Sequence, residues 1–137
     1  MGVDLNLKKN KAVFFDRDGI INKSIIRNKE PFPPHNLESL EINDEIINVL
    51  KFTNKNNFLN IIVTNQPDAE RGLAKKEDID EINNYIFNNL LIDEIYVCWD
   101  SQDNMSNFRK PLPGMLLKAS EDFSIDLGSS FIVGDRW

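Results

Sequence analysis

Short apolar runs alternate with longer segments of helical periodicity along this chain, and this order restricts the fold more than any other feature. Strands are expected at residues 11–15, 59–63, 95–98 and 130–133, because each is a brief apolar run that ends in polar residues. Helices are expected at residues 43–52, 76–90 and 113–123. Since strands that alternate with helices are joined by right-handed crossovers, the chain predicts an α/β fold with a mostly parallel sheet covered by helices on both faces.

The segment between the first expected strand and the first expected helix is interpreted as a loop. Pro31, Pro33 and Pro34 interrupt residues 23–40, and proline lacks the backbone N–H that regular structure uses. His35 follows Pro34 and is expected at the surface, although a histidine can also act as an acid or base near neutral pH.

Length and charge narrow the classes of function. A chain of 137 residues suits a single domain, 1–137, with one core. The formal net charge of −6 argues against a nucleic acid or a membrane surface as partner. No apolar run approaches the roughly 20 residues that span a bilayer, and residues 1–11 contain no apolar segment suited to secretion. The single cysteine, Cys98, excludes an internal disulfide and fits a reducing cytoplasm.

Two carboxylates, Asp16 and Asp18, directly follow the first expected strand. Residues two apart on an extended chain point the same way, so these side chains can converge on one small volume. Like charges held that close repel unless a proton or a cation lies between them. The pair therefore indicates a proton-sharing dyad or a site for a hard cation such as magnesium, and the alternative is an ordinary polar turn.

Further polar groups are expected at the same edge of the sheet. Thr64 and Asn65 follow the second expected strand, Asp135 follows the fourth, and Lys110 lies in a basic pair with Arg109. Ligands of open parallel sheets bind beyond the carboxyl ends of the strands. A hydrolase that passes a phosphoryl group through an aspartyl-phosphate needs a nucleophilic carboxylate, an acid/base, a metal and a cation, and residues of these types are present.

Four short motifs, at residues 16–19, 63–65, 110–111 and 133–136, resemble in order the signatures of the haloacid dehalogenase superfamily of phosphatases. Residues 16–22, 64–67, 71–72 and 109–116 resemble its subgroup IIIA, in particular the D-glycero-D-manno-heptose 1,7-bisphosphate phosphatases and the related histidinol-phosphate phosphatases. The resemblance covers residues 12–137 and implies a three-layer Rossmann-like fold.

The resemblance implies a role for each matching residue. Asp16 would be the nucleophile and a magnesium ligand. Asp18 would protonate the leaving oxygen, then activate water, and its backbone carbonyl would also reach the metal. Lys110 would stabilise the charge on Asp16 and on the phosphoryl group.

The remaining matching positions are assigned to binding. Thr64 and Asn65 would hold the phosphate, Arg109 would contact the rest of the substrate, and Asp135 would be the remaining carboxylate on magnesium.

The chain departs from the subgroup that it resembles in two places, the zinc-binding loop and the C-terminal end, and it has no room for the large cap domain of other superfamily branches. A zinc-binding loop of many members corresponds to residues 98–108, where only Cys98 remains, so no zinc is expected. About 45 residues separate the first two motifs, too few for a large cap domain, and residues 25–40 would supply only a small flap facing the substrate. The chain ends at Trp137, before a helix and a strand of the family, so lower stability or dimerisation over the open sheet edge is expected, with a monomer or a homodimer as the assembly.

Three functions follow from these observations. The leading hypothesis is a magnesium-dependent phosphatase acting on a heptose bisphosphate destined for bacterial surface polysaccharide. The second is a histidinol-phosphate phosphatase or a broader phosphomonoesterase. The third is a truncated, non-catalytic remnant that binds magnesium and phosphate.

Overall fold

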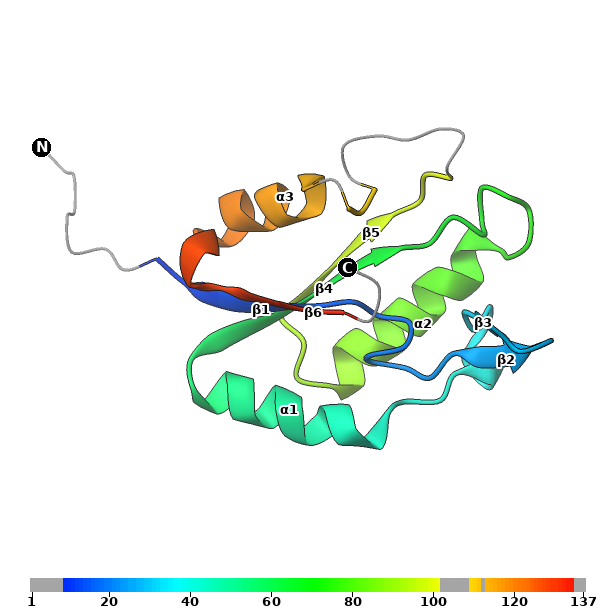
Figure 1. The fold of residues 1–137 in the computed structure, drawn as a ribbon, viewed down its shortest axis with the longest axis horizontal. Helices are drawn as coiled ribbons and strands as arrows, with labels where there is room; N and C mark the ends of the chain where they lie inside the picture. The colour runs from blue at the N-terminus through cyan, green and yellow to red at the C-terminus, as the bar shows by residue number, and fades with distance from the viewer. Residues whose placement is uncertain (1–8, 102–108, 112, 135–137) are drawn as a thin grey trace, which may run out of the picture.

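A parallel sheet forms the centre of the protein (Figure 1). The computed structural model describes residues 9–101, 109–111 and 113–134, and within them the sheet has four strands. These strands are β1 (Lys11–Phe15), β4 (Phe58–Asn65), β5 (Glu94–Cys98) and β6 (Phe131–Val133), in the spatial order β5–β4–β1–β6. The predicted parallel α/β fold is thus confirmed.

The strand register brings the ends of β1 and β4 to one edge of the sheet. Phe15, the last residue of β1, pairs with Ile62 of β4 on one side and with Val133 of β6 on the other. Since these strands run in the same direction, the residues that follow Phe15, Asn65 and Val133 leave the sheet at its carboxyl edge. This edge therefore collects the sequence motifs that follow separate strands.

Helices cover both faces of the sheet, which gives the predicted three layers. Figure 1 shows α1 (Asp44–Lys55) and α2 (Lys76–Asn89) on one face and α3 (Gly114–Phe123) on the other. Alternate strand residues point to opposite faces, so the apolar runs of β1 and β4 supply both cores. One core packs Val13, Phe15 and Ile62 against Ile46, Leu50, Ile82 and Ile86, and the other packs Phe14, Ile61 and Val63 against Met115 and Ala119.

The loop predicted for residues 23–40 is wrong, because this segment contains a hairpin and a short 3-10 helix. The hairpin pairs β2 (Ile25–Arg27) with β3 (Glu30–Phe32), and η1 (Leu37–Ser39) follows. Asn28 and Lys29 have φ values of 50° and 67°, as a two-residue hairpin turn requires. Pro31 lies opposite Ile26, next to the pair that closes the turn. That position makes no ladder hydrogen bond, so the proline is tolerated.

The hairpin lies beside the carboxyl edge of the sheet (Figure 1).

None of the helices within the described ranges is long and apolar enough to cross a membrane. At the sheet edge, Phe131 and Ile132 of β6 have exposed fractions of 61% and 47%.

A fully buried amide, Asn60, interrupts the apolar run of β4. Its Nδ2 donates to the carbonyl oxygens of Leu50 and Leu91 at 3.1 and 2.8 Å, and its Oδ1 accepts from the hydroxyl of Thr53. Buried polar atoms are tolerated when they are hydrogen-bonded in this way. Asn60 thus joins the end of α1 and the start of the β5 segment to the central sheet.

Replacing Asn60 with leucine is expected to lower the free energy of unfolding by about 2–4 kcal/mol, because the apolar side chain cannot replace the three hydrogen bonds of the buried amide with Leu50, Leu91 and Thr53. Urea unfolding measures this loss. The matched control is Asn56→Leu, since Asn56 is an exposed asparagine that also donates to a carbonyl of α1, that of Phe52. We expect the control to change stability little, and equal losses in the two variants would contradict this role of Asn60.

Candidate active site

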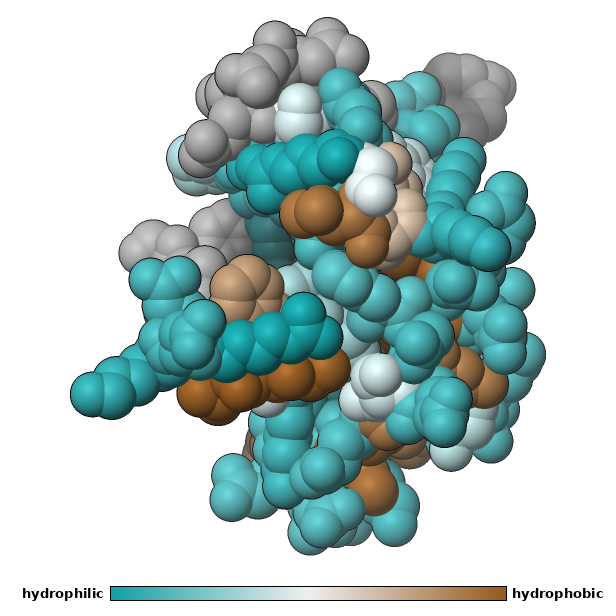
Figure 2. Space-filling view, turned by 90° about the vertical axis from the view of Figure 1, so that its right-hand side faces the viewer, coloured by the Kyte–Doolittle hydropathy of each residue, from teal (hydrophilic) through white to brown (hydrophobic). Residues whose placement is uncertain are grey.

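An open pocket of about 550 Å³ lies at the carboxyl edge of the sheet. Figure 2 shows this side of the molecule as a largely hydrophilic surface with smaller apolar areas around a recess. The charged side chains that line the pocket come from separate segments: Asp16, Asp18, Asp68, Arg71, Arg109 and Lys110. The β2–β3 hairpin contributes Pro31 and Phe32, so the predicted flap does face the pocket.

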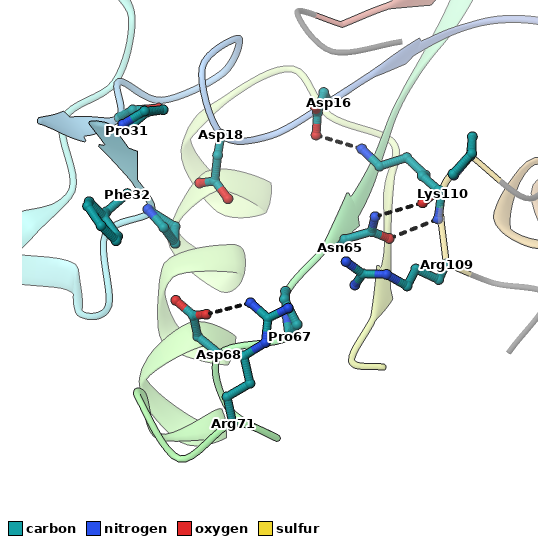
Figure 3. A pocket seen from close by; sticks show the side chains of 13 residues that line it. Asp16, Asp18, Pro31, Phe32, Asn65, Pro67, Asp68, Arg71, Arg109 and Lys110 are labelled. Carbon is teal, nitrogen blue, oxygen red and sulfur yellow. Dashed lines mark hydrogen bonds and ion pairs between the residues drawn. The ribbon is translucent and has the colours of Figure 1, made fainter. Parts of the chain in front are cut away.

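Lys110 forms an ion pair with Asp16 in this pocket (Figure 3). The Nζ of Lys110 donates to Oδ1 of Asp16 at 2.6 Å and to the carbonyl oxygen of Val63 at 2.9 Å. Both side chains are largely buried, with exposed fractions of 12% and 17%. Within the described residues, Oδ2 of Asp16 accepts no hydrogen bond, so this oxygen remains available to a ligand of the pocket.

Asn65 fixes the backbone of Lys110. Its Oδ1 accepts from the N–H of Lys110 at 3.0 Å, and its Nδ2 donates to the carbonyl oxygen of the same residue at 3.3 Å. The strand end that carries Asn65 therefore places the lysine, which comes from a distant part of the chain, beside Asp16.

Asp18 is held by donors on both of its carboxylate oxygens. Arg17 donates to Oδ1 from Nε at 3.2 Å and from Nη2 at 2.9 Å, and Asn22 donates to the same oxygen at 3.0 Å. Gln66 donates to Oδ2 at 2.8 Å. These bonds restrict the carboxylate to one orientation at the pocket.

The structure thus places five of the predicted site residues, Asp16, Asp18, Asn65, Arg109 and Lys110, around one pocket, and their roles stay predictions. Arg109 lines the pocket and donates from Nη1 to the carbonyl oxygen of Asp100 at 2.7 Å.

Of the other two predicted site residues, Thr64 is buried beneath the pocket lining, and Asp135 is not described by the structure. Thr64 has an exposed fraction of 1% and does not line the pocket, and its hydroxyl oxygen accepts from Gln66 at 2.9 Å. Its role in phosphate binding stays a prediction. Asp135 lies outside the described residues, as do residues 102–108, which contain most of the loop where the absence of zinc was predicted.

The comparisons with known proteins agree with this geometry. The family model described as polynucleotide kinase 3 phosphatase matches residues 11–136. A D-glycero-alpha-D-manno-heptose-1,7-bisphosphate 7-phosphatase of Campylobacter jejuni is 35% identical over 93% of this chain and 73% of its own length. The chain belongs to the haloacid dehalogenase superfamily of phosphatases.

Further relatives of this phosphatase have similar names. A D-glycero-beta-D-manno-heptose-1,7-bisphosphate 7-phosphatase of Helicobacter pylori is 33% identical over 93% of this chain and 73% of its own length. A crystal structure of the D,D-heptose 1,7-bisphosphate phosphatase of B. bronchiseptica, complexed with magnesium and phosphate, has a TM-score of 0.78 and 22% identity. That match covers 91% of this chain and 70% of the other, and it shows the same fold.

Arg17 contacts a predicted site residue, Asp18, but the sequence analysis gave it no role. Its side chain is fully buried, and its Nη1 donates to Oδ1 of Asn83 on α2 at 2.9 Å. A charged residue in a turn between two acids is expected at the surface, so the local sequence carries no signal for its burial. Gln66 was also missed, although it directly follows a predicted site motif.

His35 is not the surface residue that was expected. Its ring is half-buried, and Nε2 lies 2.7 Å from Oδ2 of Asp68. The partner comes from the turn after β4, which lies far from His35 in the sequence, so the contact depends on the fold.

Proposed function

We propose that this protein is a magnesium-dependent phosphatase that hydrolyses a heptose bisphosphate through an aspartyl-phosphate. The observation that carries the proposal is the Lys110–Asp16 ion pair, which lies in the pocket beside a fixed second carboxylate, Asp18. The substrate class is inferred from relatives at 33–35% identity whose names specify heptose-1,7-bisphosphate.

The chemistry follows from the positions of the three charged groups. Asp16 attacks phosphorus with its unpaired oxygen, while Lys110 neutralises the charge that develops on the carboxylate and the phosphoryl oxygens. Asp18 enters the first step protonated and gives its proton to the leaving sugar oxygen as the bond between that oxygen and phosphorus breaks. It then takes a proton back from the water that cleaves the aspartyl-phosphate. The bonds from Arg17, Asn22 and Gln66 hold Asp18 in position for both transfers.

Magnesium fits the donor set of this edge. Asp16 and Asp18 provide hard oxygen atoms, and we assign Asp16, the backbone carbonyl of Asp18, and Asp135 as the groups that would hold the ion. When bound, magnesium supplies positive charge that lowers the repulsion between the carboxylates and the phosphate. Zinc has no part in the proposal, because Cys98 is the only cysteine of the chain and structural zinc sites take four nitrogen or sulfur ligands.

A small substrate suits the site better than a polymer. The pocket volume of about 550 Å³ lies in the range of small-molecule sites. The net charge of −6 does not attract a polynucleotide. The lone thiol suits a reducing compartment, so we place the reaction in the cytoplasm.

Phosphate release with magnesium tests the proposed function. The substrates are the α and β anomers of heptose 1,7-bisphosphate, histidinol phosphate and an aryl phosphate. We expect the highest kcat/KM for one heptose anomer and loss of activity when a chelator removes the metal. A kcat/KM for histidinol phosphate above those for both heptose bisphosphates would show that the proposed substrate is wrong. If folded protein released phosphate from none of the compounds, the non-catalytic alternative would be favoured.

A further inference from the structure

Asp68 joins two potentially cationic side chains from different segments at one side of the pocket. Its Oδ2 lies 2.7 Å from Nε2 of His35, and its Oδ1 lies 3.7 Å from Nη1 of Arg71. The Asp68 side chain has an exposed fraction of only 11%. Burial of a carboxylate is costly unless partners compensate for the lost water, so His35 and Arg71 set its environment. The contact with His35 also attaches the segment after the β2–β3 hairpin to the turn after β4.

The turn that carries Asp68 and Arg71 has a defined backbone. The N–H of Arg71 donates to the carbonyl oxygen of Pro67 at 3.0 Å, and the N–H of Leu73 donates to that of Asp68 at 2.8 Å. Gly72 has a φ of 77°, a conformation that glycine adopts without the strain of a side chain. The side chain of Arg71 therefore starts from a fixed backbone position.

Arg71 carries a guanidinium group that is suited to binding an anion. Figure 3 shows Arg71 and Asp16 on opposite sides of the pocket that both residues line. Among the described residues, the guanidinium makes the long ion pair with Asp68 and no hydrogen bond, and its exposed fraction is 41%. A planar guanidinium presents several N–H donors in a fork that matches a phosphate.

The two carboxylates at the Asp16 side of the pocket each form a short ion pair with a cationic side chain. Asp16 pairs with Lys110 at 2.6 Å, and Asp18 pairs with Arg17 at 2.9 Å. A substrate phosphate that reacts at Asp16 therefore meets Lys110, whereas a second phosphate on the same molecule needs a further cation. Within the described residues, the other two cations of the pocket lining are Arg109, whose Nη1 already donates to the carbonyl oxygen of Asp100, and Arg71. Arg71 lines the same pocket on the side opposite Asp16, so it can meet a group at the far end of a substrate that reacts at Asp16.

We propose that Arg71, oriented by Asp68 and His35, binds the phosphate that is not hydrolysed and thereby selects bisphosphates over monophosphates. This inference rests on the proposed phosphatase function. Arg71 is a specificity-determining residue in this scheme, and Asp68 and His35 are positioning residues that act through it.

The test compares heptose 1,7-bisphosphate with heptose 7-phosphate, which lacks the second phosphate. The measured quantity is the kcat/KM for the bisphosphate divided by that for the monophosphate. In Arg71→Ala, this ratio is expected to fall by about 10-fold or more, mostly through a higher KM for the bisphosphate. Arg71→Lys should restore part of this ratio. Asp68→Asn and His35→Ala should lower it less, because the guanidinium remains present.

Lys75→Ala is the matched control, because it removes one positive charge from an exposed side chain near Arg71 that does not line the pocket. It should keep the wild-type ratio. Equal losses for both substrates in Arg71→Ala, or an unchanged ratio, would overturn the inference.

A binding measurement separates this inference from the proposed function. In protein carrying Asp16→Asn, which cannot form the aspartyl-phosphate, the dissociation constants of both sugars are measured by calorimetry with and without Arg71→Ala. Selective weakening of the bisphosphate supports the role of Arg71 even if wild-type protein hydrolyses neither sugar. Equal weakening, or none, overturns that role even if the enzyme is active.

Discussion

Replacing Asp16 with asparagine is expected to abolish phosphate release, with kcat reduced by about 10⁴-fold or more. The amide keeps the shape of the carboxylate but is not a nucleophile, so no aspartyl-phosphate forms. Lys110 keeps its hydrogen bond to the carbonyl oxygen of Val63, and its backbone stays paired with Asn65. The fold should therefore be retained, and a circular dichroism spectrum and melting curve close to those of the wild type would show this.

Two further variants make this experiment decisive. Asp16→Ala excludes recovery of a carboxylate by slow hydrolysis of the asparagine amide. Asp80→Asn makes the same acid-to-amide change at an exposed position of α2 and should retain full activity. Substantial turnover by both Asp16 variants would mean that another group attacks phosphorus, and the proposed mechanism would then be wrong.

Replacing Arg17 with methionine is expected to impair both stability and turnover. The guanidinium is fully buried and donates twice to Asp18 and once to Asn83. The methionine side chain cannot donate, so these two residues would lose their hydrogen bonds to position 17. Removal of one partner from a buried charge pair typically costs about 3–5 kcal/mol, and the lower part of that range applies because the Asp18 side chain is 23% exposed. Loss of a residue that orients a catalytic group typically lowers activity by about 10–100-fold.

The two effects of Arg17→Met can be separated. Urea unfolding gives the stability, and kcat is measured at a temperature where the variant is folded. Asn83→Ala removes the contact between Arg17 and α2 but leaves both bonds to Asp18, so it should destabilise the protein with little change in kcat. If Asn83→Ala lowered kcat as strongly as Arg17→Met, positioning of Asp18 would not explain the loss.

Elements with a strong apolar pattern could be predicted from the sequence. The first strand was predicted at residues 11–15 and is observed at Lys11–Phe15, because a short run of four apolar side chains that ends in polar residues is typical of a buried strand. The helix predicted at 43–52 extends to Lys55. Its last turn includes Thr53, which is buried because it contacts Asn60, and this contact depends on the tertiary structure.

The hairpin and the buried Arg17 could not be predicted by the same reasoning. Proline at position 31 argued against a strand, yet its effect depends on which side of the ladder its nitrogen faces. The burial of Arg17 depends on Asn83, and the environment of His35 depends on Asp68, so both require contacts between distant segments. The site residues with motif-like spacing were easier to find because strand ends fix their positions.

Asn65 aligns Lys110 through two hydrogen bonds to the backbone of that residue. Its amide donates to and accepts from the backbone of one residue, Lys110, much as a peptide unit of a neighbouring strand would do. The side chain thus acts as a substitute for one step of a β-ladder, and the segment around Lys110 needs no strand of its own to align the lysine. The position of the cation that faces the nucleophile therefore depends directly on the end of β4.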